Sequence, residues 1–149
     1  MPLFIAEFVG TFLLILLGNG VVANVLLKKS KGFQSGWIVI SFGWGLAVAF
    51  AVYAVGWISG AHINPAVTIG FAAIGKITWS VVPYYLTGQF LGAFLGALTV
   101  WLTYYNHFES TSGQAEKLLC FSTKPAIRSD PWNFFTEVIA TAVLLFGIL

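Results

Sequence analysis

Apolar residues fill four long stretches of this chain, and polar residues are confined mainly to the connections between them. A helix needs about 20 predominantly apolar residues to cross a bilayer. The first three stretches reach that length, and the fourth is still apolar at the last residue of the sequence. We therefore predict transmembrane helices over roughly Leu3–Leu27, Phe33–Ile58, Trp79–Tyr105 and from about Phe134 to Leu149.

The two longer connections differ in character. Residues 106–131 are polar and hold most of the remaining charges, which predicts an aqueous loop. Residues 59–76 are largely apolar, contain several glycines and one proline, and carry no charge before Lys76. This second segment is too short to cross the membrane and too apolar to lie in water. We predict a re-entrant segment that enters the bilayer and returns on the same side.

A short pattern of Glu, two further residues, a small residue and Thr occurs twice, at Glu7–Thr11 and at Glu137–Thr141. Each copy opens an apolar span. Three spans separate the copies, so a repeat would reverse its direction across the membrane, as in inverted-repeat proteins. This divides the chain into a first repeat, residues 1–131, and the start of a second, residues 132–149. The match is short, and chance is the alternative.

The re-entrant segment contains a helix-start signal at Asn64-Pro65. Asn is a favoured N-cap, and Pro is favoured at the first helical position. A short helix over Ala66–Ala73 would place free N–H groups and a partial positive charge deep in the membrane. Residues 60–63 would run extended before it and leave backbone carbonyls unpaired. Such groups are tolerated at membrane depth where they face a water-filled cavity or other protein.

Composition agrees with a membrane protein. The chain is 58% hydrophobic and 8% charged, whereas soluble domains carry about 25% charged residues. Its mean hydropathy is +0.89. The net charge of +2 comes from scattered loop residues, which argues against nucleic-acid binding. The single Cys120 excludes an internal disulfide, and no metal-ligand spacing or nucleophile–base pair occurs. We predict no enzyme activity, metal or cofactor.

The segment S-G-A-H-I-N-P-A-V, Ser59 to Val67, resembles the first signature loop of the major intrinsic protein family, the aquaporins and glycerol facilitators. The resemblance extends over essentially the whole chain, as the first half of a family member. It implies an all-α, multi-pass protein of the cell membrane: a transmembrane helix bundle with a re-entrant half-helix, forming the first half of an aquaporin-like inverted repeat. It also implies a homotetramer with one pore in each subunit.

The resemblance assigns roles to the residues of this loop. Asn64 would donate its side-chain amide to a passing hydroxyl or water, and Pro65 and Ala66 would support the loop. Carbonyls before Asn64 would accept hydrogen bonds, so the expected pore-lining set includes Gly60, Ala61, His62 and Ile63. The His62 ring either lines the pore or props the loop. Glu7 and Glu137 would be buried and bind backbone N–H groups of two re-entrant loops, although Glu7 at the membrane interface is the alternative.

Trp44 is the residue on which we base the prediction of the substrate. The glycerol facilitator branch resembles this chain in placing Trp at the narrow filter, where it forms an apolar wall for the carbon backbone of a polyol. Val48, one turn further on, would extend that wall. The F-S-T sequence at Phe121–Thr123 also resembles this branch. We predict a passive channel for glycerol, other small polyols and water. The alternatives are a water-selective aquaporin, an ion-coupled transporter or a non-conducting scaffold, with Trp44 merely packed or lipid-facing.

Small residues at every fourth position, Gly88, Gly92 and Gly96, form a stripe on the third span. Such stripes let transmembrane helices approach closely. We expect the stripe to pack within the chain, and a contact between subunits is the alternative.

Two expectations concern orientation and extent. The family topology places the N-terminus in the cytoplasm, but the loops that it places outside hold most of the Lys and Arg, against the positive-inside rule. The second re-entrant loop and its filter Arg do not occur before Leu149. Either the sequence continues beyond this point, which we expect, or two copies pair in opposite orientations. The external cations are Lys28, Lys29, Lys31, Lys117, Lys124 and Arg128, and Lys76 is internal.

Overall fold

The computed structural model describes residues 1–149 as seven helices. The long helices are α1 (Pro2–Leu26), α2 (Trp37–Ser59), α4 (Val82–Thr103) and α7 (Asp130–Ile148). The short ones are α3 (Pro65–Ala73), α5 (Tyr105–Ser110) and α6 (Gln114–Leu119). All four long helices have the length and apolar composition needed to cross a membrane. The prediction of an all-α membrane fold is confirmed.

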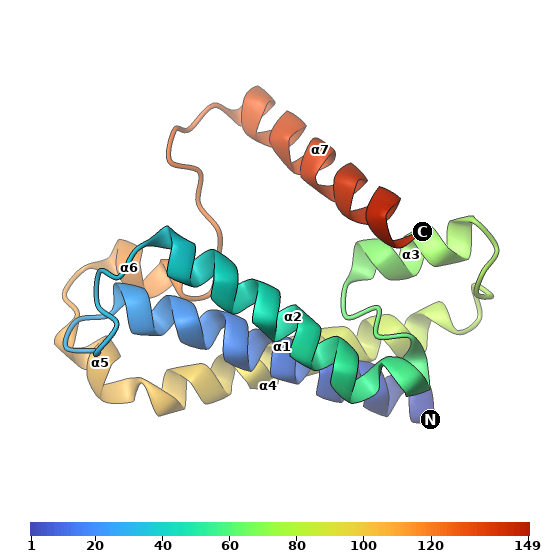
Figure 1. The fold of residues 1–149 in the computed structure, drawn as a ribbon, viewed down its shortest axis with the longest axis horizontal. Coiled ribbons are helices and arrows are strands. Elements are labelled where there is room, and N and C mark those ends of the chain that lie inside the picture. The colour runs from blue at the N-terminus through green and yellow to red at the C-terminus, as the bar shows by residue number, and fades with distance from the viewer.

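Helix α1 is the centre of the bundle and packs along both α2 and α4 (Figure 1). Its contact with α4 uses the glycine stripe. A Cβ atom on Gly88 would lie 2.6 Å from the Phe4 carbonyl oxygen, and one on Gly96 would lie 2.8 Å from that of Phe12. A Cβ on Gly92 would overlap the Phe8 carbonyl oxygen. The expectation that the stripe packs within the chain is confirmed.

One end of the bundle is closed by the connection between α4 and α7. The Lys28 backbone N–H donates to Thr111 Oγ1 at 2.9 Å, which ties the α1–α2 loop to the start of this connection. Phe108 and Cys120 are buried with the last turn of α1, and burial raises the pKa of the Cys120 thiol to about 11. The predicted aqueous loop therefore contains some regular structure. It folds into α5 and α6 because its apolar side chains cover the end of α1.

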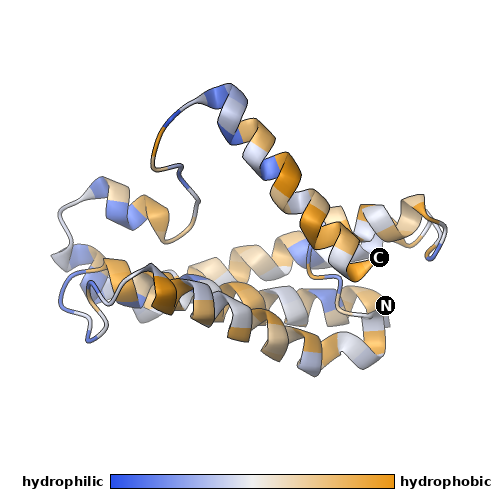
Figure 2. Ribbon diagram, turned by 45° about the horizontal axis from the view of Figure 1, so that its top comes forward, coloured by the Kyte–Doolittle hydropathy of each residue, from blue (hydrophilic) through white to orange (hydrophobic).

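Polar segments lie mainly in the connections, and apolar residues cover the long helices (Figure 2). The loop that carries Lys28, Lys29 and Lys31 lies at the same end of the bundle as α6, which carries Lys117 (Figure 1). Lys76 lies at the opposite end, after α3. The unequal distribution of positive charge is thus a difference between the two ends of the bundle.

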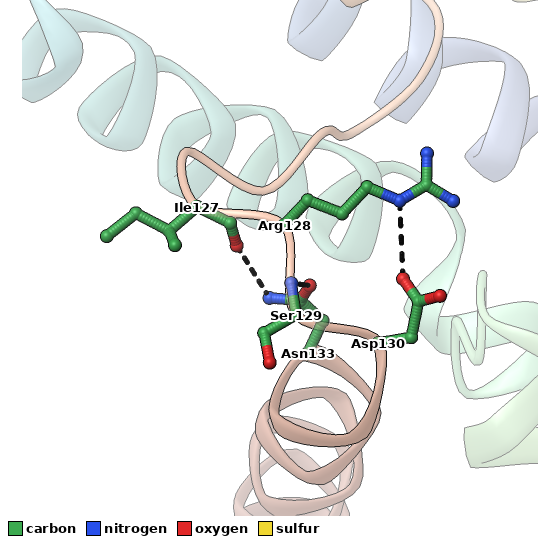
Figure 3. A network of polar contacts seen from close by, with 5 residues as sticks. All are labelled: Ile127, Arg128, Ser129, Asp130 and Asn133. Carbon is green, nitrogen blue, oxygen red and sulfur yellow. Dashed lines mark hydrogen bonds and ion pairs between the residues drawn. The ribbon is translucent and has the colours of Figure 1, made fainter.

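Helix α7 begins at Asp130, earlier than the predicted start near Phe134. The side chain of Asn133 organises this start (Figure 3). Its Oδ1 accepts from the Ser129 backbone N–H at 2.7 Å, and its Nδ2 donates to the Ile127 carbonyl at 3.2 Å. Asp130 also pairs with Arg128 at 3.3 Å and adds a negative charge at the positive end of the helix. These polar contacts extend α7 ahead of its apolar run.

Helix α7 lies apart from α1, α2 and α4, and its C-terminal end reaches α3 (Figure 1). The contact with α3 forms at Gly70, where a Cβ atom would lie 3.1 Å from Leu149 and 3.3 Å from Leu145. No residue of α7 is buried. The first three long helices therefore form the packed unit, and most of the apolar surface of α7 is exposed.

Candidate functional site

The N-terminus of α3 is fixed by Asn64. Its backbone is extended, with φ −154° and ψ 127°, and its side-chain Oδ1 accepts from the Ala66 N–H at 2.8 Å. Pro65 occupies the start of the helix, where a missing N–H is no loss. The predicted helix start at Asn64-Pro65 is confirmed. Because Oδ1 is held by Ala66, the amide nitrogen of Asn64 points away from the helix, and its two hydrogens remain without a partner in the chain.

A fully buried carboxylate holds the segment before α3 in place. Glu7 Oε1 accepts from Ser59 Oγ at 2.6 Å and from the His62 N–H at 3.0 Å. Its Oε2 accepts from the Ile63 N–H at 2.7 Å and from Gln89 Nε2 at 2.8 Å. A carboxylate inside a membrane protein is costly unless such partners are present. The structure therefore brings Glu7 against the loop, whereas no group of three or more His, Cys, Asp or Glu side chains is placed to hold a metal ion.

Ser59 and Gln89 are members of this network that the sequence reasoning missed. Gln89 is fully buried on α4 and also donates to Thr68 Oγ1 at 3.0 Å, which links α4 to α3. Its signal in the sequence is an amide side chain in the middle of an otherwise apolar span. Ser59 is the last residue of α2. Neither contact is visible from spacing alone, because the partners are 52 and 82 residues from Glu7.

The backbone of residues 60–63 is not extended, which corrects the expectation from the sequence. Gly60, Ala61 and Ile63 have positive φ angles of 79°, 48° and 43°. For Ala61 and Ile63 this conformation costs on the order of 1–3 kcal/mol each. The cause is the Glu7 carboxylate, which draws two successive N–H groups toward one side, while the Ala61 N–H bonds to Ser59 Oγ at 3.1 Å.

The same arrangement leaves the carbonyl groups of this segment free. None of the carbonyl oxygens of residues 60–63 accepts a hydrogen bond from the chain. At membrane depth such unpaired carbonyls are tolerated where they face a water-filled cavity or other protein. The loop thus offers a row of acceptors that ends at the free amide hydrogens of Asn64.

The ring of His62 is packed inside the protein. It lies between Phe71 and Tyr85, with ring centroids 4.6 and 4.4 Å away, and its Nδ1 is 3.1 Å from Thr68 Oγ1. Tyr85 in turn donates to the Ser59 carbonyl at 2.8 Å. Only 6% of His62 is exposed. Of the two interpretations of the ring, this geometry favours support of the loop, and only the His62 carbonyl is left to line a path.

Trp44 lies on a cavity between α1 and α2, here called the Trp44 cavity. Its ring packs against Gly18, where a Cβ atom would lie 2.5 Å from ring carbon Cζ3. The cavity has a volume of about 660 Å³, and the F-S-T segment forms part of its wall. Small-molecule sites occupy about 300–1,000 Å³. The lining residues are Ile15, Asn19, Val22, Trp37, Ile40, Ser41, Trp44, Leu119, Phe121, Ser122, Thr123 and Lys124.

Two expected site residues lie elsewhere. Val48 follows Trp44 by one turn of α2 but does not line the Trp44 cavity, and 43% of it is exposed. Glu137 lies exposed on α7 and accepts no hydrogen bond, so it has no environment like that of Glu7. Helix α7 packs against no neighbouring long helix of this chain, and the role expected for Glu137 at a second re-entrant loop stays a prediction.

The sequence profile of the major intrinsic protein family matches residues 2–149. The chain belongs to the major intrinsic protein family. It is 61% identical to a probable glycerol uptake facilitator protein of Thermotoga maritima and 54% identical to the glycerol uptake facilitator protein of Bacillus subtilis, over all 149 residues of the chain. The chain spans 64% and 54% of the lengths of these relatives.

A solved structure of a major intrinsic protein shares this fold. The X-ray structure of the aquaglyceroporin from Plasmodium falciparum is 41% identical and superimposes with a TM-score of 0.67. The match covers 72% of this chain and 43% of the aquaglyceroporin. The resemblance to the glycerol facilitator branch and the prediction of a multi-pass membrane protein are confirmed.

Proposed function

We propose that the protein containing this chain is a passive channel for glycerol and other small uncharged polyols, and that it also conducts water. The observation that carries this proposal is the row of unpaired carbonyls at residues 60–63 leading to the free amide hydrogens of Asn64. A hydroxyl group both donates and accepts hydrogen bonds, so it can use the carbonyls and then the amide in turn. No covalent step and no cofactor enters this mechanism.

The start of α3 explains why the solute is uncharged. The free N–H groups and the dipole of α3 give this point a partial positive charge, which disfavours cations and protons. Half-helix ends exclude protons and cations in this way in aquaporin-type pores. Glu7 does not cancel the effect for a solute, because its carboxylate is fully buried and occupied by four hydrogen bonds from the protein.

The presence of Trp44 supports a channel that conducts glycerol rather than one that is selective for water. An indole ring gives an apolar surface for the carbon side of a polyol, and hydroxyl-bearing side chains lie in the wall of the same cavity at Ser122 and Thr123. The names of the relatives, which are glycerol uptake facilitators, support the same choice. We retain the water-selective channel as the second candidate, because the acceptor row suits water equally well.

Ion-coupled transport is the rival mechanism. It requires ionisable groups that bind a coupling ion near the middle of the membrane. Within α2 and α4 no charged residue occurs, and the Glu7 carboxylate is already satisfied by the protein. These observations favour passive diffusion.

Light scattering of vesicles that contain the protein tests the proposal. We expect rapid glycerol entry that does not depend on sodium or on a pH gradient, and rapid water movement. Water flux without glycerol entry would replace the proposal by the water-selective candidate. A strict requirement for an ion would contradict both.

The variant Asn64→Asp provides a matched probe of the loop. Asp is as good an N-cap as Asn, so the bond from the Ala66 N–H and the start of α3 are kept. The two amide hydrogens are lost, and a negative charge appears at the end of the acceptor row. We expect glycerol entry to fall at least tenfold while the protein still folds. Unchanged entry would contradict the role proposed for Asn64.

We also propose a homotetramer with one path in each subunit. Apolar side chains are widely exposed on α2 and α4, including Tyr53 at 86% and Phe90 at 66%, so these faces are available to lipid or to neighbouring subunits. The measurement is the mass of the protein in detergent after correction for bound detergent. A monomeric mass in several mild detergents would contradict the assembly.

A further inference from the structure

Asn19 is a polar residue in the middle of the apolar helix α1 and has no role in the mechanism above. It is 8% exposed, and its amide makes no hydrogen bond within the chain. The side-chain atoms that are both sealed from solvent and unpaired are Thr11 Oγ1 and Gln89 Oε1. The Asn19 amide is not among them. It is therefore accessible, and the space that it reaches is the Trp44 cavity, which it lines.

A second unpaired polar group lines the same cavity. Ser41 is on α2, one turn before Trp44, and its hydroxyl makes no hydrogen bond within the chain. The rings of Trp37 and Trp44 form part of the apolar wall. Asn19 follows Gly18, against which the Trp44 ring packs, and both Asn19 and Trp44 line the cavity. The cavity thus combines an amide and a hydroxyl with aromatic surface.

The chemistry of these groups defines the ligand that would fit. An unpaired amide within a membrane-spanning helix is costly unless water or a ligand satisfies it. An amide both donates and accepts, and so does a serine hydroxyl, which matches the hydroxyl groups of a neutral solute. Indole rings cover the carbon side of such a solute. Lys124 is the one charged residue in the lining, so the wall between α1 and α2 carries no charge.

We propose that Asn19 and Ser41, together with the Trp44 ring, form a binding subsite for the hydroxyl groups of small uncharged polyols. This inference rests on the proposed channel function and deepens it. The subsite holds a polyol in the Trp44 cavity before it reaches the row of carbonyls. Asn19 acts there as a specificity-determining contact rather than as a structural hydrogen bond.

Occupancy of the subsite is measured by tracer exchange of glycerol across vesicles as the glycerol concentration is raised equally on both sides. The concentration that halves the tracer rate reports how tightly the path holds glycerol. We expect Asn19→Leu, which keeps the size and removes the amide, to raise this concentration by about three- to tenfold, the factor for one neutral hydrogen bond.

The control is Asn24→Leu. Asn24 is on the same helix and is partly buried, but it does not line the Trp44 cavity. The same change of side chain at this position should leave the half-saturating concentration unaltered. An equal increase in both variants would assign the effect to disturbance of α1 and would overturn the proposal.

Two further variants keep the test decisive if Asn19→Leu fails to fold. Asn19→Asp keeps the shape and can still accept a hydrogen bond, so we expect it to recover part of the binding lost in Asn19→Leu. Ser41→Ala removes the other hydrogen-bonding group of the proposed subsite and should also raise the half-saturating concentration. If neither Asn19→Asp nor Ser41→Ala differs from the unaltered protein in glycerol saturation, the subsite is overturned.

Glycerol conduction by the unaltered protein distinguishes a failure of this inference from a failure of the proposed function. If it does not conduct glycerol at all, the channel proposal itself fails. If it conducts glycerol with a half-saturating concentration that none of the cavity variants changes, the channel proposal stands and only the subsite fails.

Discussion

The Oε2 atom of Glu7 lies 2.7 Å from the backbone nitrogen of Ile63, a residue with a φ angle of 43°. Ile is β-branched, and such residues are genuine outliers at positive φ. The bond from the Ile63 N–H to the carboxylate compensates for this strained conformation. The buried charge and the irregular backbone therefore depend on each other, and neither would be stable alone in the interior of a membrane protein.

This dependence predicts the effect of Glu7→Gln. The substitution keeps the shape of the side chain but turns one oxygen into an NH₂ group that faces other donors. A buried donor left without an acceptor costs about 1–3 kcal/mol. We expect a clearly lower midpoint of thermal unfolding in detergent, together with loss of glycerol entry in vesicles, because the carbonyls of residues 60–63 lose their alignment.

The matched control is Glu109→Gln, which changes an exposed carboxylate on α5 that makes no hydrogen bond. It should shift the unfolding midpoint very little. A Glu7→Gln protein that is as stable as this control would show that the carboxylate does not hold the loop.

The close approach of α1 and α4 predicts the effect of Gly92→Ala. A Cβ at this position would overlap the Phe8 carbonyl oxygen and lie 3.0 Å from the Phe12 nitrogen, so backbone rather than a flexible side chain must move. We expect destabilisation of about 1–3 kcal/mol, as for other overpacked cores. Gly20→Ala is the control, because nothing lies within 4 Å of that Cβ. Equal unfolding midpoints for the two variants would contradict the tight α1–α4 contact.

The parts of the fold that depend on hydrophobicity were predictable from the sequence. The transmembrane helices follow from apolar runs, and the start of α3 follows from the local preferences of Asn64 and Pro65. Helix α7 begins earlier than its apolar run because Asn133 binds the backbone ahead of it. Helices α5 and α6 were missed because each has only six residues, too short for a periodic pattern to appear.

The details of the site depended on contacts between distant residues. Ser59 and Gln89 join Glu7 only once α1, α2 and α4 are packed together. The positive φ angles of Ala61 and Ile63 could not be predicted, since neither residue favours this conformation and the Glu7 carboxylate imposes it. Asn19 lies within the first apolar run, and the sequence does not show that it lines the Trp44 cavity, because this depends on the packing of the helices.

The buried thiol of Cys120 makes a prediction about reactivity. Its raised pKa of about 11 leaves about one thiol in ten thousand ionised at pH 7, and only the thiolate is nucleophilic. We expect slow maleimide labelling of the folded protein at pH 7, a rate that rises as the pH approaches 11, and rapid labelling after unfolding. The control carries Cys120→Ser together with Ser122→Cys, which moves the thiol to an exposed position in the same segment. Equally fast labelling of both folded proteins would contradict the packing of Cys120.

The contact between Gly18 and Trp44 predicts that substitution of Gly18, which does not line the Trp44 cavity, alters the selectivity for glycerol over water. A Cβ on Gly18 would lie 2.5 Å from Cζ3 of the ring, so Gly18→Ala must push the indole toward the cavity that it lines. Because a polyol is wider than water, we expect glycerol entry to fall several-fold more than water permeability in vesicle light scattering. Gly20→Ala adds the same methyl group to the same helix where it touches nothing, and it should leave both rates unchanged. A parallel fall of both rates in Gly18→Ala would mean that Trp44 does not discriminate between the two solutes.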